Sequence, residues 1–242
     1  LEEYCNLKFK SQLIKGNLVR RYKRFMADVR LMDNRIVTAH CANPGSMINL
    51  LENDADVWIS YVDSPKRKLM YTLEIIRSNK TRVGVNTNIP NRLIHESLKI
   101  GEISELLGYE SIKREVNYGE KSRIDFFLEG VGRRDCYVEV KSVTLNRPEK
   151  GGKTAEFPDS VTKRGTKHLL ELSQQVKEGN RAVMLYLVQR ADCKYFSVAG
   201  DIDPAYASAI ETALNAGVEL LCYDCNISTD GIFIRNPLEI KI

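Results

Sequence analysis

Three residues have the types and spacing of a site that cleaves phosphodiesters. Asp125 lies in one apolar run, and Glu139 and Lys141 lie in the next run along the chain. Because side chains alternate along a strand, Glu139 and Lys141 project from the same face. If the turn between the runs is centred on Gly132, Asp125 lies directly opposite Glu139, with Cβ atoms about 5 Å apart. Two carboxylates that close repel each other unless a cation lies between them.

These carboxylates suit a hard divalent cation, which takes oxygen ligands and keeps several waters. We predict that Asp125, Glu139 and the backbone carbonyl of Val140 bind Mg²⁺ or Mn²⁺. Lys141 would orient or deprotonate the attacking water and stabilise charge on a phosphate. The predicted catalytic residues are therefore Asp125, Glu139 and Lys141, and Lys141 is expected to matter to catalysis rather than to folding.

A simpler arrangement also fits these residues. Glu-x-Lys is a common tripeptide, and an exposed strand with a cross-strand Asp–Lys pair would have the same sequence. Glu96, in a predicted helix, is a further candidate for the metal site, and a surface glutamate is the alternative.

Two basic segments suggest contacts with nucleic acid. The first consists of Arg20, Arg21, Tyr22, Lys23 and Arg24. Small barrels that bind nucleic acid combine basic grooves with stacking rings, although a solvated strand edge would look similar. The second consists of Lys163, Arg164, Lys167 and His168, at the start of a predicted helix. Its i, i+4 pairs of like charge destabilise a helix unless an anion such as a phosphate compensates, and a solvated helix start is the alternative.

The elements that would position these residues divide the chain in two. Short strands separated by turn signals predict a small barrel or sandwich, and a mixed α/β pattern follows. The predicted strands of the first part are 13–19, 25–31, 35–40, 57–62, 69–75 and 82–85. The second part is predicted as a helix at 90–101, strands at 112–118, 123–129 and 136–143, a helix from Ser160 or Thr162 to about 177, a strand at 181–188, a helix at 204–217 and a strand at 218–223. The stretch 144–158 contains Pro148, Gly151 and Gly152 and predicts a mobile loop.

Charge differs between the two parts. Residues 1–86 carry 15 Lys and Arg against 9 Asp and Glu, a net of +6, whereas the whole chain carries only +4. This asymmetry suggests a basic binding half joined to a half with an acidic site. No apolar run approaches the roughly 18 residues of a membrane span, and no cofactor fingerprint is present, so we expect no membrane partner and no small-molecule cofactor. The scattered cysteines are typical of a cytoplasmic protein, and the Cys222–Cys225 pair suits packing better than redox or metal work.

Several of these motifs resemble the sugar fermentation stimulation protein family. They are Arg21–Phe25, Ser122–Phe126, Glu139–Leu145, Phe157–Thr162, and Arg164-Gly165 with His168-Leu169. The resemblance runs from about Leu13 to Cys225 and departs at Asn43-Pro44-Gly45, where many members read Asn-Thr-Gly. It implies an α+β protein with a small all-β OB-like barrel (residues 1–86) and a mixed α/β, restriction-endonuclease-like domain of the PD-(D/E)xK type (residues 87–242). It also implies DNA binding without strong sequence preference, and a link to sugar (maltose) metabolism.

Two hypotheses follow. The first is a Mg²⁺- or Mn²⁺-dependent nuclease that binds DNA through its barrel. The second is a non-enzymatic DNA-binding regulator of sugar (maltose) metabolism genes that keeps the acidic cluster for folding or metal binding. An intact Asp125, Glu139 and Lys141 set favours the first, and an oligomer is compatible with either.

Overall fold

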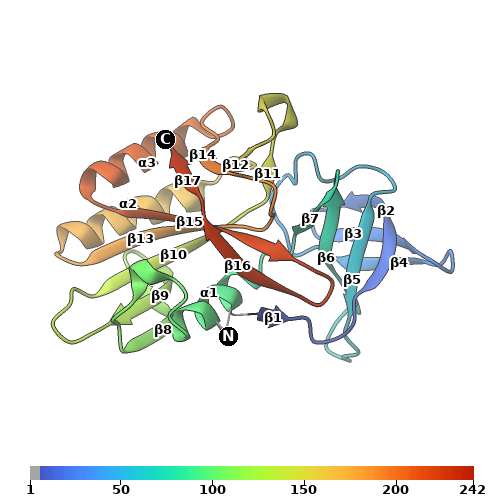
Figure 1. Cartoon of the computed structure of the whole chain (residues 1–242), viewed down its shortest axis with the longest axis horizontal. Helices are drawn as coiled ribbons and strands as arrows, with labels where there is room; N and C mark the ends of the chain where they lie inside the picture. The colour runs from blue at the N-terminus through green and yellow to red at the C-terminus, as the bar shows by residue number, and fades with distance from the viewer. Residues whose placement is uncertain (1–5) are drawn as a thin grey trace.

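The first half of the chain forms a small closed barrel. The computed structural model describes residues 6–242. Five strands make the barrel: β2 (Ile14–Tyr22), β3 (Met26–Leu31), β4 (Ile36–His40), β5 (Asp56–Tyr61) and β6 (Tyr71–Ser78). They lie in the order β4-β3-β2-β5-β6, and β4 pairs in parallel with β6 to close the ring. A further strand, β7 (Thr81–Gly84), pairs with β6 (Figure 1).

Alternating apolar residues explain which side of each barrel strand faces inward. Val29 and Leu31 of β3, and Val57 and Ile59 of β5, are buried at two-residue intervals in one core. This is the period that a half-buried strand requires. The predicted barrel is confirmed, and its strands lie within a few residues of the predicted bounds.

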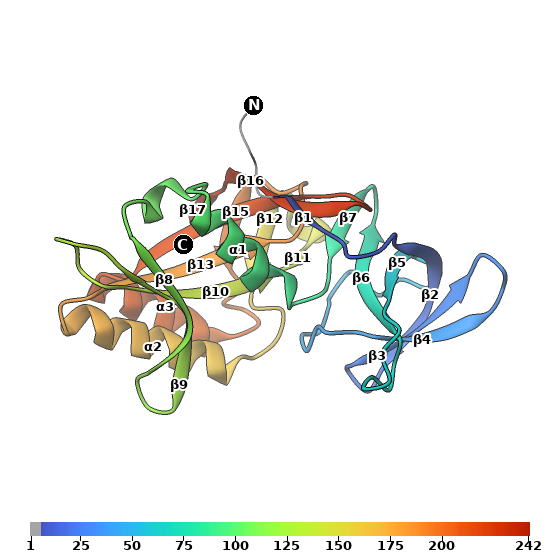
Figure 2. The ribbon, with the colours of Figure 1, turned by 90° about the horizontal axis from the view of Figure 1, so that it is seen from below.

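The second half is a seven-stranded sheet between helices, so the expected α+β class is confirmed. The sheet order is β1-β16-β15-β13-β10-β9-β8. Its strands are β1 (Asn6–Lys8), β8 (Ser111–Tyr118), β9 (Ser122–Glu129), β10 (Cys136–Val143), β13 (Arg181–Val188), β15 (Glu219–Ile227) and β16 (Gly231–Pro237). Helix α1 (Ile89–Lys99) packs on one face, and α2 (Lys163–Lys177) and α3 (Pro204–Ala216) pack on the other (Figure 2). Within residues 6–242, no helix is long and apolar enough to cross a membrane.

Helix ends occur where the sequence signals predict them. The Thr162 side chain caps α2 by accepting the Gly165 N–H, and the Asp203 side chain caps α3 by accepting the Tyr206 N–H. Each satisfies a backbone donor that the first helical turn leaves unpaired. Gly217 ends α3 at a φ of +99°, a conformation that glycine adopts without strain.

The first described strand belongs to the second half, not to the barrel. β1 pairs antiparallel with β16, with Leu7 opposite Ile232. Assigning all of residues 1–86 to the barrel is therefore wrong for Asn6–Lys8, because pairing with a strand more than 200 residues away leaves no local signal. Residues 1–5 of that predicted unit lie outside the described residues.

The prediction of a mobile loop over 144–158 is also wrong. This stretch contains β11 (Leu145–Asn146), a 3₁₀ turn (Pro148–Lys150) and β12 (Thr154–Phe157). These strands join β14 (Tyr195–Val198) and β17 (Glu239–Lys241) in a four-stranded sheet, and a second 3₁₀ turn (Ser104–Leu106) follows α1. Proline and glycine mark only the tip of the stretch.

A buried arginine fixes the base of that tip. Arg147 is 8% exposed and donates to Glu156 at 2.6 Å and to Asp201 at 2.6 Å. Hydrogen bonds that the Arg147 guanidinium donates to these two carboxylates raise its pKa. Both partners are distant in the sequence, so the order of this segment could not be predicted from its composition.

Hydrogen bonds hold the two halves together on one side of the sheet. The Met47 N–H donates to Asp159 Oδ2 at 2.9 Å, and the Gly84 N–H donates to the Gln189 carbonyl at 2.9 Å. Gly45 lies so close to Asp159 that a Cβ atom at position 45 would overlap its carboxylate. The barrel therefore meets the second half through a tight contact that only glycine permits.

We predict that Gly45→Ala destabilises the protein by about 1–3 kcal/mol, the usual cost of forcing an atom into a packed contact. Urea unfolding measures the loss. A double-mutant cycle supplies the control, because Gly45→Ala should cost little more when Asp159→Ala has already removed the carboxylate. Additive effects would contradict a direct clash between residues 45 and 159.

Candidate active site

The register of the β9–β10 hairpin brings the two predicted carboxylates together. Tyr137 pairs with Phe127, and Val138 pairs with Phe126. One further step in this register sets Asp125 opposite Glu139. The backbone ladder ends at that step, and Asp125 Oδ2 instead accepts the Val140 N–H at 2.8 Å.

Glu139 is buried with only one of its carboxylate oxygens satisfied. Its side chain is 4% exposed, and Oε1 accepts from Lys141 Nζ at 2.7 Å and from His168 Nδ1. Oε2 has no hydrogen-bond partner among the described residues. Leaving a buried charged oxygen unpaired is costly, so this atom is the clearest sign of a missing positive partner.

Asp125 is held by the first turn of α1. Asn91 Nδ2 donates to Asp125 Oδ1 at 2.6 Å. The predicted ligand Glu96 lies elsewhere on the same helix, where it pairs with Lys99 at 3.1 Å and His95 at 3.3 Å and is 46% exposed. The surface alternative for Glu96 therefore holds, and Asn91 is the α1 residue that the sequence analysis missed.

The environments of the two carboxylates move their pKa values apart. Burial, and then the charge of Glu139, raise the pKa of Asp125 to about 6. Burial also opposes ionisation of Glu139, but the Lys141 charge and the His168 hydrogen bond outweigh it and lower the pKa of Glu139. Carboxylates separated in this way are typical of active sites and metal sites.

Two further buried groups surround the pair. The Tyr118 hydroxyl and Glu171 Oε2 have no hydrogen-bond partner among the described residues. Burial, followed by the charges of Glu139, Glu171 and Asp125, raises the pKa of Tyr118. Neither Tyr118 nor Glu171 belongs to a recognisable motif, and only the fold brings them to the site.

This arrangement fits a hard divalent cation. Asp125 and Glu139 supply carboxylate oxygens, and Glu139 Oε2 is free to accept a cation. Because the N–H and C=O of one strand residue point toward the same neighbour, the Val140 carbonyl also faces β9, where the ladder has ended. Within residues 6–242 no three His, Cys, Asp or Glu side chains form a complete metal-binding group, so waters and substrate oxygens would complete the shell.

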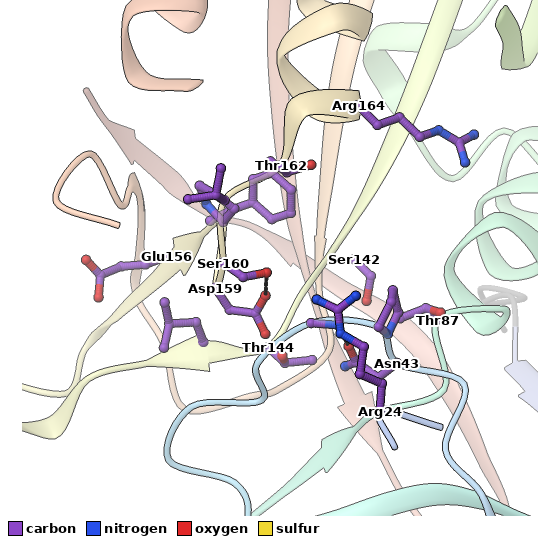
Figure 3. A pocket seen from close by; sticks show the side chains of 16 residues that line it. Arg24, Asn43, Thr87, Ser142, Thr144, Glu156, Asp159, Ser160, Thr162 and Arg164 are labelled. Atoms are coloured by element: carbon purple, nitrogen blue, oxygen red, sulfur yellow. Dashed lines mark hydrogen bonds between the residues drawn. The ribbon is translucent and has the colours of Figure 1, made fainter. Parts of the chain in front are cut away.

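A cleft of about 380 Å³ lies between the barrel and the second half (Figure 3). Ser142 and Thr144 line it and continue β10 and its extension beyond Lys141, while Thr162 and Arg164 line it from the start of α2. The barrel contributes Arg24 and the Asn43–Gly45 turn. Asp125, Glu139 and Lys141 do not line the cleft; Arg164, which does, donates to His168, and His168 binds Glu139.

Comparison with known proteins places this architecture in a family. Residues 19–85 match the model described as the SfsA N-terminal OB domain, and residues 88–231 match the sugar fermentation stimulation protein RE domain. The chain belongs to the sugar fermentation stimulation protein family.

Similar relatives cover nearly the whole chain of this family member. A sugar fermentation stimulation protein homolog from Maricaulis maris is 50% identical over 236 residues, covering 98% of this chain and 99% of the relative. A homolog from Rhodospirillum centenum is 51% identical over 235 residues, covering 97% and 100%. The solved structure of Pyrococcus furiosus SfsA in complex with Ca²⁺ has the same fold, with a TM-score of 0.89, 24% identity, and coverage of 99% of this chain and 100% of that chain.

In this family member, some side chains of the first predicted DNA-binding segment bind other parts of the protein, and others lie at the tip of a hairpin. Arg20 pairs with Asp28 at 2.8 Å and stacks on the Tyr22 ring at 4.8 Å. Arg21 donates to the carbonyls of Asn43 at 2.8 Å and Gly45 at 2.9 Å, so it fixes the turn beside the cleft. These side chains are occupied by contacts within the protein.

The tip of the β2–β3 hairpin carries the accessible part of that segment. Lys23 and Arg24 adopt positive φ angles there, and both are exposed. Phe25 is 47% exposed and stacks on His40, with ring centroids 6.5 Å apart. Because the Arg20 side chain is also 67% exposed, the accessible basic surface of this hairpin combines Arg20 with Lys23, Arg24 and Phe25, and only Arg21 is turned to the cleft-side turn.

The second predicted segment, on α2, also contains both exposed and buried side chains. Lys163 and Arg164 are exposed, and Lys167 donates to the Glu120 carbonyl at 2.6 Å. His168 is 3% exposed, so assigning it to DNA contact is wrong; burial and its bond to Glu139 place it in the carboxylate site. Arg164 Nε donates to His168 Nε2 at 3.2 Å, which makes this pair attractive and removes the expected like-charge repulsion.

The cysteine pair does not form a second site. Cys222 and Cys225 are free and buried on β15, and they face opposite sides of the sheet in different cores. Burial raises the pKa of both thiols. The packing interpretation is therefore the one that the geometry supports.

We predict that Asp125→Asn stabilises the metal-free protein at pH 7.5. The pKa of Asp125 is raised from an ordinary 3.8 to about 6, so the folded state favours the protonated carboxyl. The stability gained from this protonation is fully present below about pH 4 and is lost as pH rises through 6. Removing the charge should raise the melting temperature by a few degrees, at about 2–4 °C per kcal/mol for a chain of this size. Thermal unfolding in chelator at pH 7.5 and pH 5 measures the effect.

The advantage of Asp125→Asn should shrink at pH 5, where wild-type Asp125 is already protonated. Asp33→Asn is the matched control, because hydrogen bonds from Arg35 lower the pKa of Asp33 and its substitution should not stabilise the protein at pH 7.5. A variant at position 125 that melts below wild type at pH 7.5 would contradict the burial argument.

Proposed function

We propose that this protein is a divalent-metal-dependent nuclease of the PD-(D/E)xK type that binds DNA without strong sequence preference. One observation carries the proposal: Glu139 Oε2 is buried and unpaired beside Asp125, and Lys141 lies on the same strand face. A buried carboxylate oxygen without a hydrogen-bond partner is rare in proteins, whereas a metal site needs carboxylate oxygens that are free to bind a cation.

Mg²⁺ or Mn²⁺ would be held by Asp125, Glu139 and the Val140 carbonyl. When bound, such a cation supplies Lewis-acid stabilisation of a phosphoryl oxygen and a more acidic water. The Pyrococcus furiosus relative was solved with Ca²⁺, another hard cation that takes oxygen ligands, which supports a cation as the natural partner of this fold.

The chain's own residues prepare the site. Lys141 and His168 both bind Glu139 Oε1, so they fix the carboxylate and leave Oε2 free. Arg164 holds the other nitrogen of His168, which selects the tautomer that donates to Glu139. The Lys141 ammonium, 13% exposed, would stabilise charge on the phosphate or orient the attacking water.

The neighbouring cleft suits the strand that continues from the cleaved phosphate. Arg24 enters it from the barrel, and hydroxyl groups of Ser142, Thr144 and Ser160 line it (Figure 3). Cations and hydroxyls are the groups that contact phosphates and sugars without reading sequence. A DNA substrate and buried free thiols also agree with a cytoplasmic location, which is part of this proposal.

A second candidate function is a non-enzymatic DNA-binding regulator of sugar (maltose) metabolism genes. The observation that favours it is the Lys141–Glu139–His168 cluster, because an ion pair of 2.7 Å already balances the Glu139 charge without a metal. In that case the site would stabilise the fold, and the relatives' name would describe the effect of DNA binding alone.

Cleavage assays separate the two candidates. We predict that the purified protein cleaves at least one member of a panel of single-stranded, duplex and branched DNA and RNA in Mn²⁺, and that Asp125→Ala abolishes cleavage but not DNA binding. If no nucleic acid is cleaved while DNA still binds, the regulator is the better account.

Lys141→Met tests the role of the lysine. We predict that it reduces metal-dependent cleavage by about 100-fold or more, the scale of one lost electrostatic group in an active site. Contrary to the expectation from the sequence, it should also lower the melting temperature, since removing one partner of a buried ion pair leaves a charge uncompensated.

Lys177→Met is the matched control for that test, because it removes an exposed cation from the last turn of α2, away from the predicted binding residues at the start of that helix. This control should keep both stability and cleavage close to wild type. Full cleavage by Lys141→Met, assayed well below its melting temperature, would make Lys141 a structural counter-ion only.

A further inference from the structure

A second hollow, of about 260 Å³, lies where the barrel meets the start of α1. We call it the basic hollow, because Lys8, Lys10, Arg67 and Arg92 line it together with His40. Lys8 ends β1 and Lys10 follows it, Arg67 lies between β5 and β6, and Arg92 lies on α1. These segments are distant in sequence, so no window of the chain reveals the cluster, although both views show β1 passing α1 on its way to the barrel (Figures 1 and 2).

The four Lys and Arg side chains of the basic hollow have no carboxylate partner among residues 6–242. Arg67 donates to Thr72 Oγ1 at 2.7 Å, a neutral acceptor. Several cations elsewhere on the barrel do have carboxylate partners. Lys15 lies 3.1 Å from Asp56, Arg30 lies 2.9 Å from Asp54, and Arg35 lies 2.7 Å from Asp33. The four cations of the basic hollow therefore keep their charge uncompensated, unlike Lys15, Arg30 and Arg35.

The carboxylate that lines the basic hollow is already engaged. Glu74 is 7% exposed, and it accepts from Ser60 Oγ at 2.6 Å and from Asn86 Nδ2 at 2.8 Å. These bonds tie Glu74 to the segment that leads into α1. The hollow keeps a surplus of positive charge despite this acid.

That segment, residues 86–92, connects three features of the molecule. Asn86, Asn88, Ile89 and Arg92 line the basic hollow. Thr87 lines the cleft, and Asn91 donates to the Asp125 carboxylate. The basic hollow and the cleft therefore lie on either side of one short stretch of chain, next to the carboxylate pair.

We propose that the basic hollow binds the sugar–phosphate backbone of a nucleic-acid strand whose neighbouring phosphate lies at Asp125 and Glu139. This inference rests on the proposed nuclease function and adds the path of the strand. Unpaired Lys and Arg side chains from different segments bind a polyanion through phosphate contacts and counterion release. His40 lines the hollow, and its ring stacks on the exposed Phe25 ring. The Phe25 ring offers a stacking surface to a base.

Binding measured at several salt concentrations tests this path. The probes are a fluorescein-labelled single strand of thymidines and a labelled duplex, in chelator so that neither is cut. The variant Lys10→Ala/Arg67→Ala/Arg92→Ala should weaken binding at least tenfold at physiological salt. The slope of log K against log salt is negative, and it should become less negative by about two, since each lost phosphate contact removes about 0.7–0.9 from its magnitude.

The matched control is Lys15→Ala/Arg30→Ala/Arg35→Ala, which removes the same charge from paired positions. It should bind close to wild type. Equal losses in both triple variants would show a response to net charge alone and overturn the inference, as would wild-type binding by the basic-hollow variant. If the triple variant does not fold, the single variants Lys10→Ala and Arg92→Ala, at exposed positions, should each reduce the magnitude of the slope by about 0.7–0.9.

Cleavage by the wild type in Mn²⁺ is measured on the same probes. If the wild type cleaves a probe but the basic-hollow variants bind it as the wild type does, the strand path is refuted and the nuclease proposal is not. A wild type that binds neither probe at low salt would overturn both.

Discussion

The candidate site depends on one half-satisfied carboxylate. Glu139 is buried at the centre of the sheet, and Lys141 and His168 both bind the same oxygen. A single buried ion pair would be expected to use both oxygens, because an unpaired one costs free energy. Two donors therefore orient Glu139 through one oxygen, and the second oxygen has no partner among the described residues, which is the arrangement that a cation site would need.

Much of the surrounding structure follows from this requirement. Asp125 replaces the next rung of the β9–β10 ladder with a side-chain bond to Val140, which opens the sheet where a cation would lie. Asn91 fixes Asp125 from α1, and Arg164 fixes His168 from α2. Helices on opposite faces of the sheet thus hold the site, so its geometry depends on the packing of the whole second half.

Local patterns predict the strands β2 to β10, β13 and β15 and the three helices, but not β1, β11, β12, β14, β16 or β17. Alternation along Cys136–Val143 placed Glu139 and Lys141 on one face, and caps at Thr162 and Asp203 located two helices. Contacts between distant segments could not be predicted, because they leave no periodic signal. The sequence predicts His168 as a surface cation, whereas the fold places it against Glu139. It predicts 144–158 as mobile, whereas Arg147 binds Glu156 and Asp201 and orders this stretch.

The most direct test of a cation at this carboxylate pair is a crystal structure of the protein grown with Mn²⁺, with anomalous diffraction recorded at the manganese edge. The account predicts one strong peak within about 2.5 Å of an oxygen of both Asp125 and Glu139, with Glu139 Oε2 as a ligand and waters completing the shell. A peak confined to other carboxylates, or a fully ordered site in which Lys141 approaches Glu139 Oε2 and no manganese binds at millimolar concentration, would contradict it.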